Sequence, residues 1–289
     1  MMENNIFLEN INGRITSRPP VWFMRQAGRI LPSYLELKKK YTFDELMQDK
    51  KLAAKVTLLP IDDLSVDAGI LFSDILVIPK ALGLKLEFTN SGPKFHNALD
   101  QKINTLNLGF DSAKLEYIYD NIKEVKSQRP EVPLIGFCGG PLTTMLFMFR
   151  RNEAKKDFTD VIKLFYKEKK KCLKLMEMIT EASVEYAKKQ VNSGIDCFQL
   201  FETYCGIIPQ EMYTELILPF SKKIMNTTME KNCPTIFFPK NYNNGLKSIN
   251  RDICDYASID WQIPLETART LLNKNVGIQG NMDPRLFFS

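Results

Sequence analysis

Short apolar runs alternate with longer segments of helical periodicity along this chain of 289 residues. Most of the runs are continuously apolar, which is typical of parallel strands covered on both faces. They occupy residues 20–24, 68–73, 132–137, 196–202, 234–238, 256–260 and 276–280. Strands that alternate with helices build a parallel sheet, so the pattern predicts an α/β fold.

The segments between these runs carry helix start and stop signals. "TFDE" (42–45) has the form of a capping box, and helical spacing of apolar residues follows from Asp49. The stretch 157–193 is periodic and ends at Gly194, a favourable C-terminal cap. Pro209 is expected at the first helical position of a stretch through Met229, and residues 264–274 form a short helix.

Seven such strand–helix units favour a (β/α) barrel over an open doubly wound sheet. No G-x-G-x-x-G follows any of the strands, which weakens the dinucleotide-binding alternative. A barrel of this type closes with eight strands, and the seventh is followed only by "NMDPRLFFS" (281–289), where a helix is expected to begin. No linker interrupts the chain, so we expect one domain over residues 1–289, incomplete at its C-terminal end.

Composition excludes several classes of protein. No apolar run reaches the length of a membrane span, and the first ten residues lack the basic start of a signal peptide, so a cytoplasmic protein is expected. The formal net charge of +5 comes with a lysine-rich run at 167–174. That run matches no nucleic-acid motif, so we interpret it as a solvated helix face and expect no nucleic-acid partner.

The six cysteines are scattered and form no C-x-x-C pair. The single histidine, His96, lies in a loop rich in turn formers and is expected to be exposed and structural. No zinc-binding spacing can be assembled from these residues, and reduced, mostly buried thiols are expected.

The loops that follow the strands hold the candidate site, because active groups of a barrel lie at the carboxyl ends of its strands. These positions are Arg25 and Arg29, Asp74, the turn 138–144, the segment 202–206, Lys240, Trp261 and Asn281. Two guanidinium groups suit carboxylates or phosphates. Asp74 either pairs with an arginine or stabilises a developing cation, and the spacing leaves both roles open.

Five segments closely resemble the uroporphyrinogen decarboxylase family, and the similarity runs from about residue 10 to the end. They are "PVWFMRQAGRILPSY" (20–34), "LFSDILVIPKALGL" (71–84), "VPLIGFCGGPLTT" (132–144), "ASIDWQIPLETAR" (257–269) and "VGIQGNMDPRLF" (276–287). The resemblance implies a (β/α)₈ barrel that decarboxylates the four acetate arms of uroporphyrinogen III in haem and tetrapyrrole biosynthesis. It implies no metal, no organic cofactor and a homodimer.

The resemblance also assigns residues. Arg25 and Arg29 match arginines that contact the carboxylates of the substrate, and the binding segment comprises Arg25, Gln26, Ala27, Gly28 and Arg29. Asp74 matches an aspartate that faces the pyrrole N–H groups, and Thr203 matches a hydroxyl that helps to hold a side chain of the substrate. Asp74, Arg25 and Arg29 are therefore the predicted catalytic residues.

Two departures from the family pattern leave alternatives open. Phe147 stands where the family carries a tyrosine, and the chain ends before the last strand, helix and histidine of the family. A truncated, non-catalytic relic that binds porphyrinogens is the main alternative. A corrinoid-type methyltransferase on a related barrel is a weaker one, because the zinc ligands it needs have no match here.

Overall fold

The fold is built on a parallel sheet whose strands stand in the order in which they occur in the chain. The computed structural model describes residues 5–24, 31–89, 92–105, 108–150 and 158–288. Among them six strands form this sheet, each parallel to its neighbours. They are β1 Gly69–Ile70, β4 Leu134–Gly139, β5 Cys197–Glu202, β6 Thr235–Pro239, β7 Tyr256–Ser258 and β8 Gly277–Gln279. The predicted α/β class and parallel sheet are confirmed.

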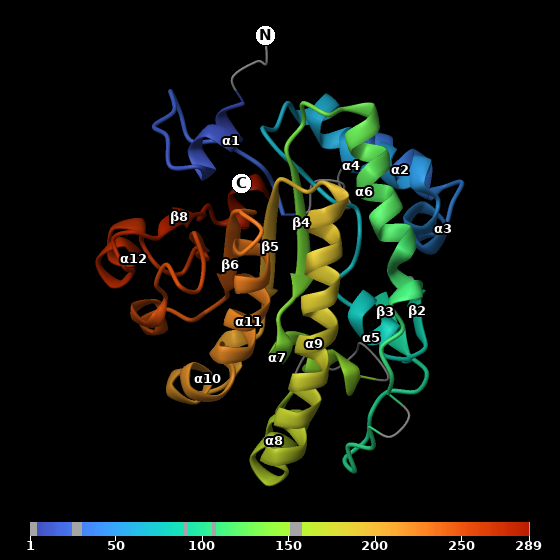
Figure 1. The fold of residues 1–289 in the computed structure, drawn as a ribbon, viewed down its shortest axis with the longest axis vertical. Helices are drawn as coiled ribbons and strands as arrows, with labels where there is room; N and C mark the ends of the chain where they lie inside the picture. Colours follow the sequence, from blue (N-terminus) through green and yellow to red (C-terminus); the bar gives the residue numbers. More distant parts are fainter. Residues whose placement is uncertain (1–4, 25–30, 90–91, 106–107, 151–157, 289) are drawn as a thin grey trace.

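Helices α4, α6, α9 and α11 form a row along one face of this sheet, and each packs on the next (Figure 1). The helices are α1 Ile6–Ile11, α2 Pro32–Lys38, α3 Phe43–Gln48, α4 Lys50–Leu64, α5 Val77–Ala81, α6 Glu116–Gln128, α7 Pro141–Met148, α8 Thr159–Lys167, α9 Lys169–Ser193, α10 Gln210–Leu216, α11 Leu218–Met229 and α12 Leu265–Leu271. Single turns of 3₁₀ helix occur at Ser112–Leu115, Cys205–Ile207, Asn244–Ser248 and Pro284–Phe288.

The first predicted strand, residues 20–24, is not a strand in the structure. Pro19 and Pro20 lack the N–H groups that a ladder needs, and the Val21 amide donates to the Asp67 carboxylate at 2.6 Å instead. The segment is nevertheless extended and lies beside the start of β1, since the Asp67 amide donates to the Val21 carbonyl at 2.8 Å.

The same segment also reaches the opposite edge of the sheet. The Trp22 indole Nε1 donates to Gln279 Oε1 of β8 at 2.9 Å. One short segment therefore touches both the β1 edge and the β8 edge of the sheet. This is possible only if the sheet curls back on itself, as a barrel does.

Two of the helix starts follow their sequence signals. Thr42 and Glu45 form the predicted capping box of α3, and the Asp49 side chain accepts from the first amides of α4. Gly194, with φ of 109°, ends α9 as predicted. The stretch that begins at Pro209 differs, because Pro209 is the N-cap of α10 rather than its first residue and a break at Ile217 separates α10 from α11.

Helix α1 closes the amino end of the sheet. Its buried residues Phe7 and Ile11 pack on the first inward-facing side chains of the central strands, which include Ile135 and Cys197. The Tyr256 hydroxyl of β7 donates to the Asn10 carbonyl at 2.5 Å and fastens the helix in place. The amino end is therefore filled by apolar packing, and the carboxyl end is left for a binding site.

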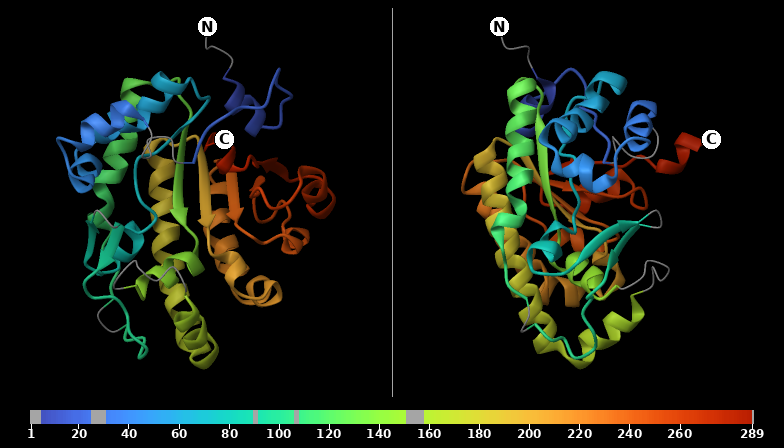
Figure 2. Two further views of the ribbon diagram at one scale, coloured as in Figure 1. Left: turned by 180° about the vertical axis from the view of Figure 1, so that it is seen from behind. Right: turned by 90° about the vertical axis from the view of Figure 1, so that its right-hand side faces the viewer.

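An antiparallel hairpin that the sequence did not predict stands outside the parallel sheet (Figure 2). It consists of β2 Leu86–Thr89 and β3 Gly92–Phe95. His96 follows β3, is exposed as predicted, and lies with its Nε2 2.7 Å from Glu87 Oε2. The turn formers near His96 thus belong to a hairpin rather than to an irregular loop.

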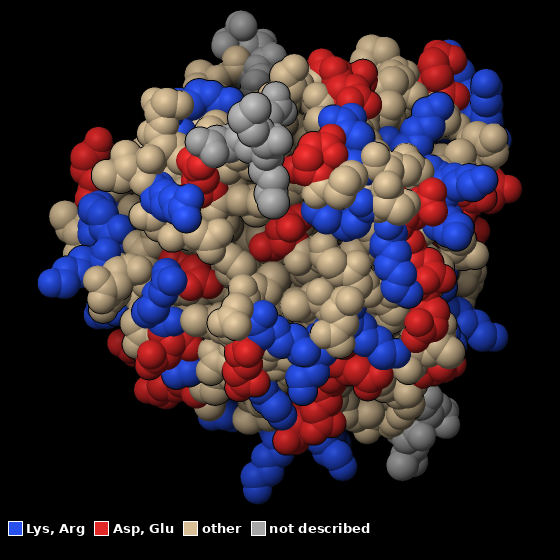
Figure 3. Space-filling view, turned by 45° about the horizontal axis from the view of Figure 1, so that its top comes forward, with Lys and Arg blue, Asp and Glu red and all other residues tan. Residues whose placement is uncertain are grey.

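The remaining expectations about the surface and the thiols hold. All six cysteines are unpaired and buried. The lysines of the run 167–174 are exposed while Cys172 among them is buried, as on a solvated helix face. On the face shown in Figure 3, acidic and basic side chains are interspersed. No helix in the described part of the chain is both long and apolar enough to cross a membrane.

Candidate active site

Five of the predicted site residues lie outside the described part of the chain. They are Arg25, Gln26, Ala27, Gly28 and Arg29, and the structure places none of them. Their neighbours on both sides are described: Trp22 is bonded to β8, and Leu31 is buried at the start of α2. The other three predicted residues, Asp74, Phe147 and Thr203, follow the neighbouring strands β1, β4 and β5.

Asp74 lies at the carboxyl edge of the sheet, between β1 and α5. Its side chain is half-buried, and its Oδ1 accepts a hydrogen bond of 2.7 Å from the Leu76 amide. The loop packs on the end of β4, because a Cβ added at Gly139 would lie only 3.2 Å from the Cβ of Ile75. The Leu76 amide therefore fixes one carboxylate oxygen of Asp74 and limits the rotation of the side chain.

The phenol of Tyr117 lies near this carboxylate. Burial raises the pKa of Tyr117, and the negative charges of Asp44 and Asp74 raise it further. Its hydroxyl is buried and has no hydrogen-bond partner among the described residues. Tyr117 is thus a neutral phenol within electrostatic reach of two carboxylates, and no sequence pattern pointed to it.

A fully buried carboxylate, Glu202, organises the next part of the site. It lies at the end of β5 and accepts from the amides of Leu142 and Thr143 at 3.2 and 2.7 Å and from Thr143 Oγ1 at 2.6 Å. These amides belong to the first turn of α7, so Glu202 caps that helix from another element. Burial raises the pKa of Glu202 to about 7, although the hydrogen bonds from Thr143, Leu142 and Tyr213 oppose the rise.

The glycine before α7 makes this contact possible. A Cβ added at Gly140 would lie 2.4 Å from the carboxyl carbon of Glu202. The two glycines of "CGGPLTT" therefore have different neighbours: Gly139 packs against Ile75, and Gly140 packs against Glu202. The sequence showed a turn here but could not show which side chain approaches it.

Helix α7 and the end of β5 bring the other two predicted residues into one region. The Tyr204 amide donates to Thr143 Oγ1 at 3.1 Å, which fixes the chain directly after the half-buried Thr203. The half-buried ring of Phe147 packs edge-on against the rings of Tyr204 and Phe158, with centroids 5.7 Å away in both cases. Phe147 therefore belongs to an aromatic cluster beside Thr203.

An aromatic layer lies inside the sheet at the carboxyl ends of β4, β5 and β6. The ring of Phe201 lies 5.6 Å from that of Phe137 and 6.1 Å from that of Phe238, each at a steep angle. All three side chains are almost fully buried. The layer gives the region between Asp74 and the β6 side an apolar floor.

The β6, β7 and β8 loops are tied together on the far side of this floor. Asp260 is buried, and its carboxylate accepts from the amides of Asn241 and Gln262 at 2.7 and 2.9 Å. The Asn281 side chain donates to the carbonyls of Asp260 and Ile263 at 3.2 and 2.6 Å. Hydrogen bonds thus connect the loops that follow β6, β7 and β8 into one side of the site.

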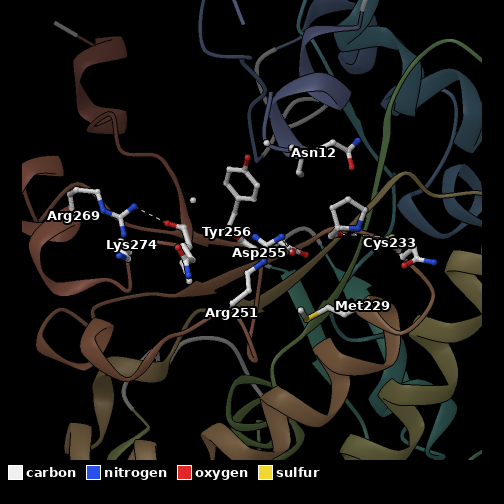
Figure 4. A pocket seen from close by; sticks show the side chains of 15 residues that line it. Asn12, Met229, Cys233, Arg251, Asp255, Tyr256, Arg269 and Lys274 are labelled. Carbon is white, nitrogen blue, oxygen red and sulfur yellow. Dashed lines mark hydrogen bonds and ion pairs between the residues drawn. The ribbon is translucent and has the colours of Figure 1, made fainter. Parts of the chain in front are cut away.

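A cavity of about 640 Å³ lies at the amino ends of β6, β7 and β8, opposite the candidate site (Figure 4). Arg251 on its wall pairs with Asp255 at 2.6 Å, and Arg269 donates to the Val276, Leu272 and Asn273 carbonyls. Its arginines thus already have partners within the chain. Active sites of such barrels lie at the carboxyl ends of the strands, which also argues against a catalytic role for this cavity.

Among the described residues, no group of three or more His, Cys, Asp or Glu side chains is placed to hold a metal ion.

The chain matches a known protein family and named relatives. Residues 2–289 match the family described as Uroporphyrinogen decarboxylase (URO-D). The chain is 36% identical over 289 residues to proteins named uroporphyrinogen decarboxylase from Geobacter metallireducens and Geobacter sulfurreducens, with 99% of this chain and 84% of each relative covered.

Two solved structures resemble the fold. A methyltransferase from Methanosarcina mazei has a TM-score of 0.76 at 18% identity, covering 96% of this chain and 81% of that one. A B12-independent methionine synthase from Shewanella sp. has a TM-score of 0.54 at 10% identity, with 86% of each chain covered. At these identities the likeness concerns the fold alone.

Proposed function

The chain belongs to the uroporphyrinogen decarboxylase family, and on that premise we propose that it converts uroporphyrinogen III into coproporphyrinogen III by removing four molecules of carbon dioxide. The observation that carries this activity to the site is the half-buried carboxylate of Asp74, held by the Leu76 amide at the carboxyl edge of the sheet. A fixed anion above an apolar floor suits a reaction in which positive charge develops on an apolar ring.

The proposed reaction uses the pyrrole ring as its own electron acceptor. A proton adds to the ring carbon next to the one that bears the acetate arm, which leaves a cationic, iminium-like ring in conjugation with the arm. The bond between the acetate methylene and its carboxylate then breaks, its electron pair flows into the ring, and carbon dioxide leaves. A second proton on the methylene carbon and loss of the first from the ring restore the pyrrole and leave a methyl group.

Asp74 would stabilise the cationic ring by facing the pyrrole N–H groups at the centre of the macrocycle. Its negative charge counts for more in a cleft with little water, because less solvent screens it. Arg25 and Arg29 are proposed to bind carboxylates of the substrate through their planar forks, and Gly28 lets the backbone approach closely. One of the arginines is the candidate proton relay, although its high pKa makes it a weak acid.

Gln26 and Ala27 complete the proposed binding segment, and the hydroxyl of Thr203 is proposed to hold a substrate side chain. Phe147 keeps an aromatic ring but offers no hydroxyl to orient Asp74. A missing hydrogen bond to a charged group costs about 1.5–3 kcal/mol, which corresponds to about a tenfold to hundredfold slower reaction if the transition state feels all of it. Phe147 therefore reduces turnover without abolishing it.

The same resemblance implies the dimer, and the other expectations come from the sequence itself. We propose a single-domain chain that acts as a homodimer in the cytoplasm and has no nucleic-acid partner. One cooperative unfolding transition and a particle of twice the chain mass in light scattering are the expected results. Two separate transitions would contradict the single domain, and a monomeric mass at micromolar concentration would contradict the dimer.

The activity is tested by anaerobic incubation with uroporphyrinogen III, followed by separation of the products by their number of carboxylates. The wild-type chain is expected to give hepta- to tetracarboxylate products, and Asp74→Ala is expected to give none. Asp100→Ala is a matched control, because the exposed Asp100 also accepts from the amide two residues on, at 2.9 Å. A correctly folded wild-type chain that gives no product would overturn the proposal.

A further inference from the structure

A cation that has no acidic partner among the described residues lies on the β6–β8 side of the site. Lys240 directly follows β6, and its Nζ lies 5.6 Å from the ring centroid of Trp261, which follows β7. On the same ring, the guanidinium carbon of Arg285 lies 6.0 Å from the centroid. Two cations from different loops thus share one indole, and cation–π attraction holds each near it.

The two cations differ in their neutralisation. Arg285 is paired with Asp283 at 2.5 Å. The other ion pairs of this part of the described chain join Lys222 to Asp252 and Arg251 to Asp255, and none includes Lys240. The Lys240 side chain is nevertheless half-buried. A partly desolvated ammonium with an aromatic contact and no carboxylate is suited to a carboxylate that arrives with a ligand.

The position of Lys240 is fixed by its neighbours. Its amide donates to the Glu202 carbonyl at 3.2 Å, and its carbonyl accepts from the Gly206 amide at 3.2 Å. The amide of the next residue, Asn241, donates to the Asp260 carboxylate at 2.7 Å. The Lys240 backbone is therefore held from both the β5 and the β7 side, which reduces the cost of ordering it around a ligand.

The distance from Asp74 indicates which part of the ligand Lys240 meets. In the sheet order β1-β4-β5-β6, the strand before Lys240 is the third neighbour of the strand before Asp74. Three strand spacings correspond to about 14 Å along the sheet. A ligand that places ring N–H groups at Asp74 therefore presents its outer substituents, not its centre, to Lys240.

We propose that Lys240, held by Trp261 and assisted by Arg285, binds a peripheral carboxylate of the tetrapyrrole. This inference rests on the proposed function for the identity of the ligand. Lys240 acts in affinity rather than in bond breaking, because Asp74 and not Lys240 is proposed to face the ring that becomes cationic. Loss of its charge therefore raises the dissociation constant and KM and leaves kcat unchanged.

The test measures equilibrium binding separately from turnover. Uroporphyrin, the oxidised ligand with the same eight carboxylates, is titrated into the wild-type chain and into Lys240→Gln, with tryptophan quenching as the readout. Lys247→Gln, the same substitution at an exposed lysine of the following 3₁₀ turn, is the matched control. Lys240→Arg keeps the charge and tests rescue.

Lys240→Gln is expected to raise the dissociation constant about three- to tenfold, the loss for one charge-assisted contact at a partly solvated site. Lys240→Arg should recover most of this affinity, and Lys247→Gln should bind as the wild type does. Equal dissociation constants for Lys240→Gln and Lys247→Gln would overturn the proposal, even in a chain that decarboxylates normally. A Lys240-dependent affinity in a chain without decarboxylase activity would support the subsite and reject the proposed function.

Discussion

Replacing Glu202 by glutamine should remove a pH dependence of stability that this one carboxyl group creates. Glu202 is fully buried, and burial raises its pKa in the folded chain from an ordinary value of 4.5 to about 7. A carboxyl group with a raised pKa in the folded state stabilises the fold while it is protonated. That contribution is complete below the pKa of the unfolded chain and is lost as the pH rises through the folded pKa.

The size of the effect follows from the two pKa values. One pKa unit corresponds to about 1.4 kcal/mol, so full ionisation lowers the free energy of unfolding by about 3 kcal/mol relative to the protonated form. Between about pH 5 and about pH 8 the expected loss is about 2.5 kcal/mol, because the unfolded carboxyl group is already largely ionised at the lower pH. A glutamine has the same shape and does not titrate.

Urea unfolding, followed by tryptophan fluorescence and circular dichroism across this pH range, measures the effect. The quantity of interest is the difference in free energy of unfolding between the wild type and Glu202→Gln at each pH, because other groups then cancel. The wild type should lose stability relative to the variant as the pH rises. Glu211→Gln is the control, since Glu211 is exposed on the next helix, α10. A difference that is constant with pH, or that grows in favour of the wild type, would refute the reasoning.

Three further substitutions have expected outcomes. Gly140→Ala should lower the free energy of unfolding by about 1–3 kcal/mol, because the new Cβ would lie 2.4 Å from the Glu202 carboxyl carbon. Gly109→Ala is the control, since a Cβ there would have no atom within 4 Å, and it should change the free energy of unfolding by less than about 0.5 kcal/mol. Equal denaturation midpoints for the two variants would argue against the clash. Asp74→Asn should keep the fold, since the asparagine amide oxygen can still accept from the Leu76 amide. It should slow formation of coproporphyrinogen about a hundredfold to a thousandfold. Undiminished turnover would remove Asp74 from the mechanism. Phe147→Tyr should raise turnover about tenfold in the same assay, unless the phenol does not reach Asp74, in which case the rate stays unchanged.

The sequence predicts the repeating architecture well because continuous apolar runs report burial on both faces of a strand. Six of the seven predicted runs overlap a strand, and the capping box at Thr42 and the stop at Gly194 are confirmed. The prediction is wrong for residues 20–24, where the apolar run alone suggested a strand. Pairing needs backbone donors and a partner in register. The missing N–H of Pro20 was readable from the sequence, but the partner in register was not.

The site was predictable where position along a strand decides it and unpredictable where side-chain direction does. Asp74, Thr203 and Lys240 follow strands, so the barrel rule finds them. Glu202 also ends a strand, but it points toward α7 rather than into the barrel, and only the folded chain reveals that Gly140 admits it. Tyr117 belongs to α6, far from any strand end in sequence, and no pattern links it to Asp74.

The seal that α1 makes at the amino end has a consequence for how the chain is made. The hydrogen bond from Tyr256 to Asn10 joins residues 246 positions apart, and that from Trp22 to Gln279 joins residues 257 positions apart. Phe7 and Ile11 are synthesised more than 200 residues before two of their partners, Ile236 in the sheet and the Tyr256 hydroxyl that binds the Asn10 carbonyl. Contacts of such long sequence separation slow folding and leave apolar side chains uncovered meanwhile. The nascent chain therefore exposes the apolar face of α1 to chaperones and to aggregation until residues as late as Tyr256 have been translated.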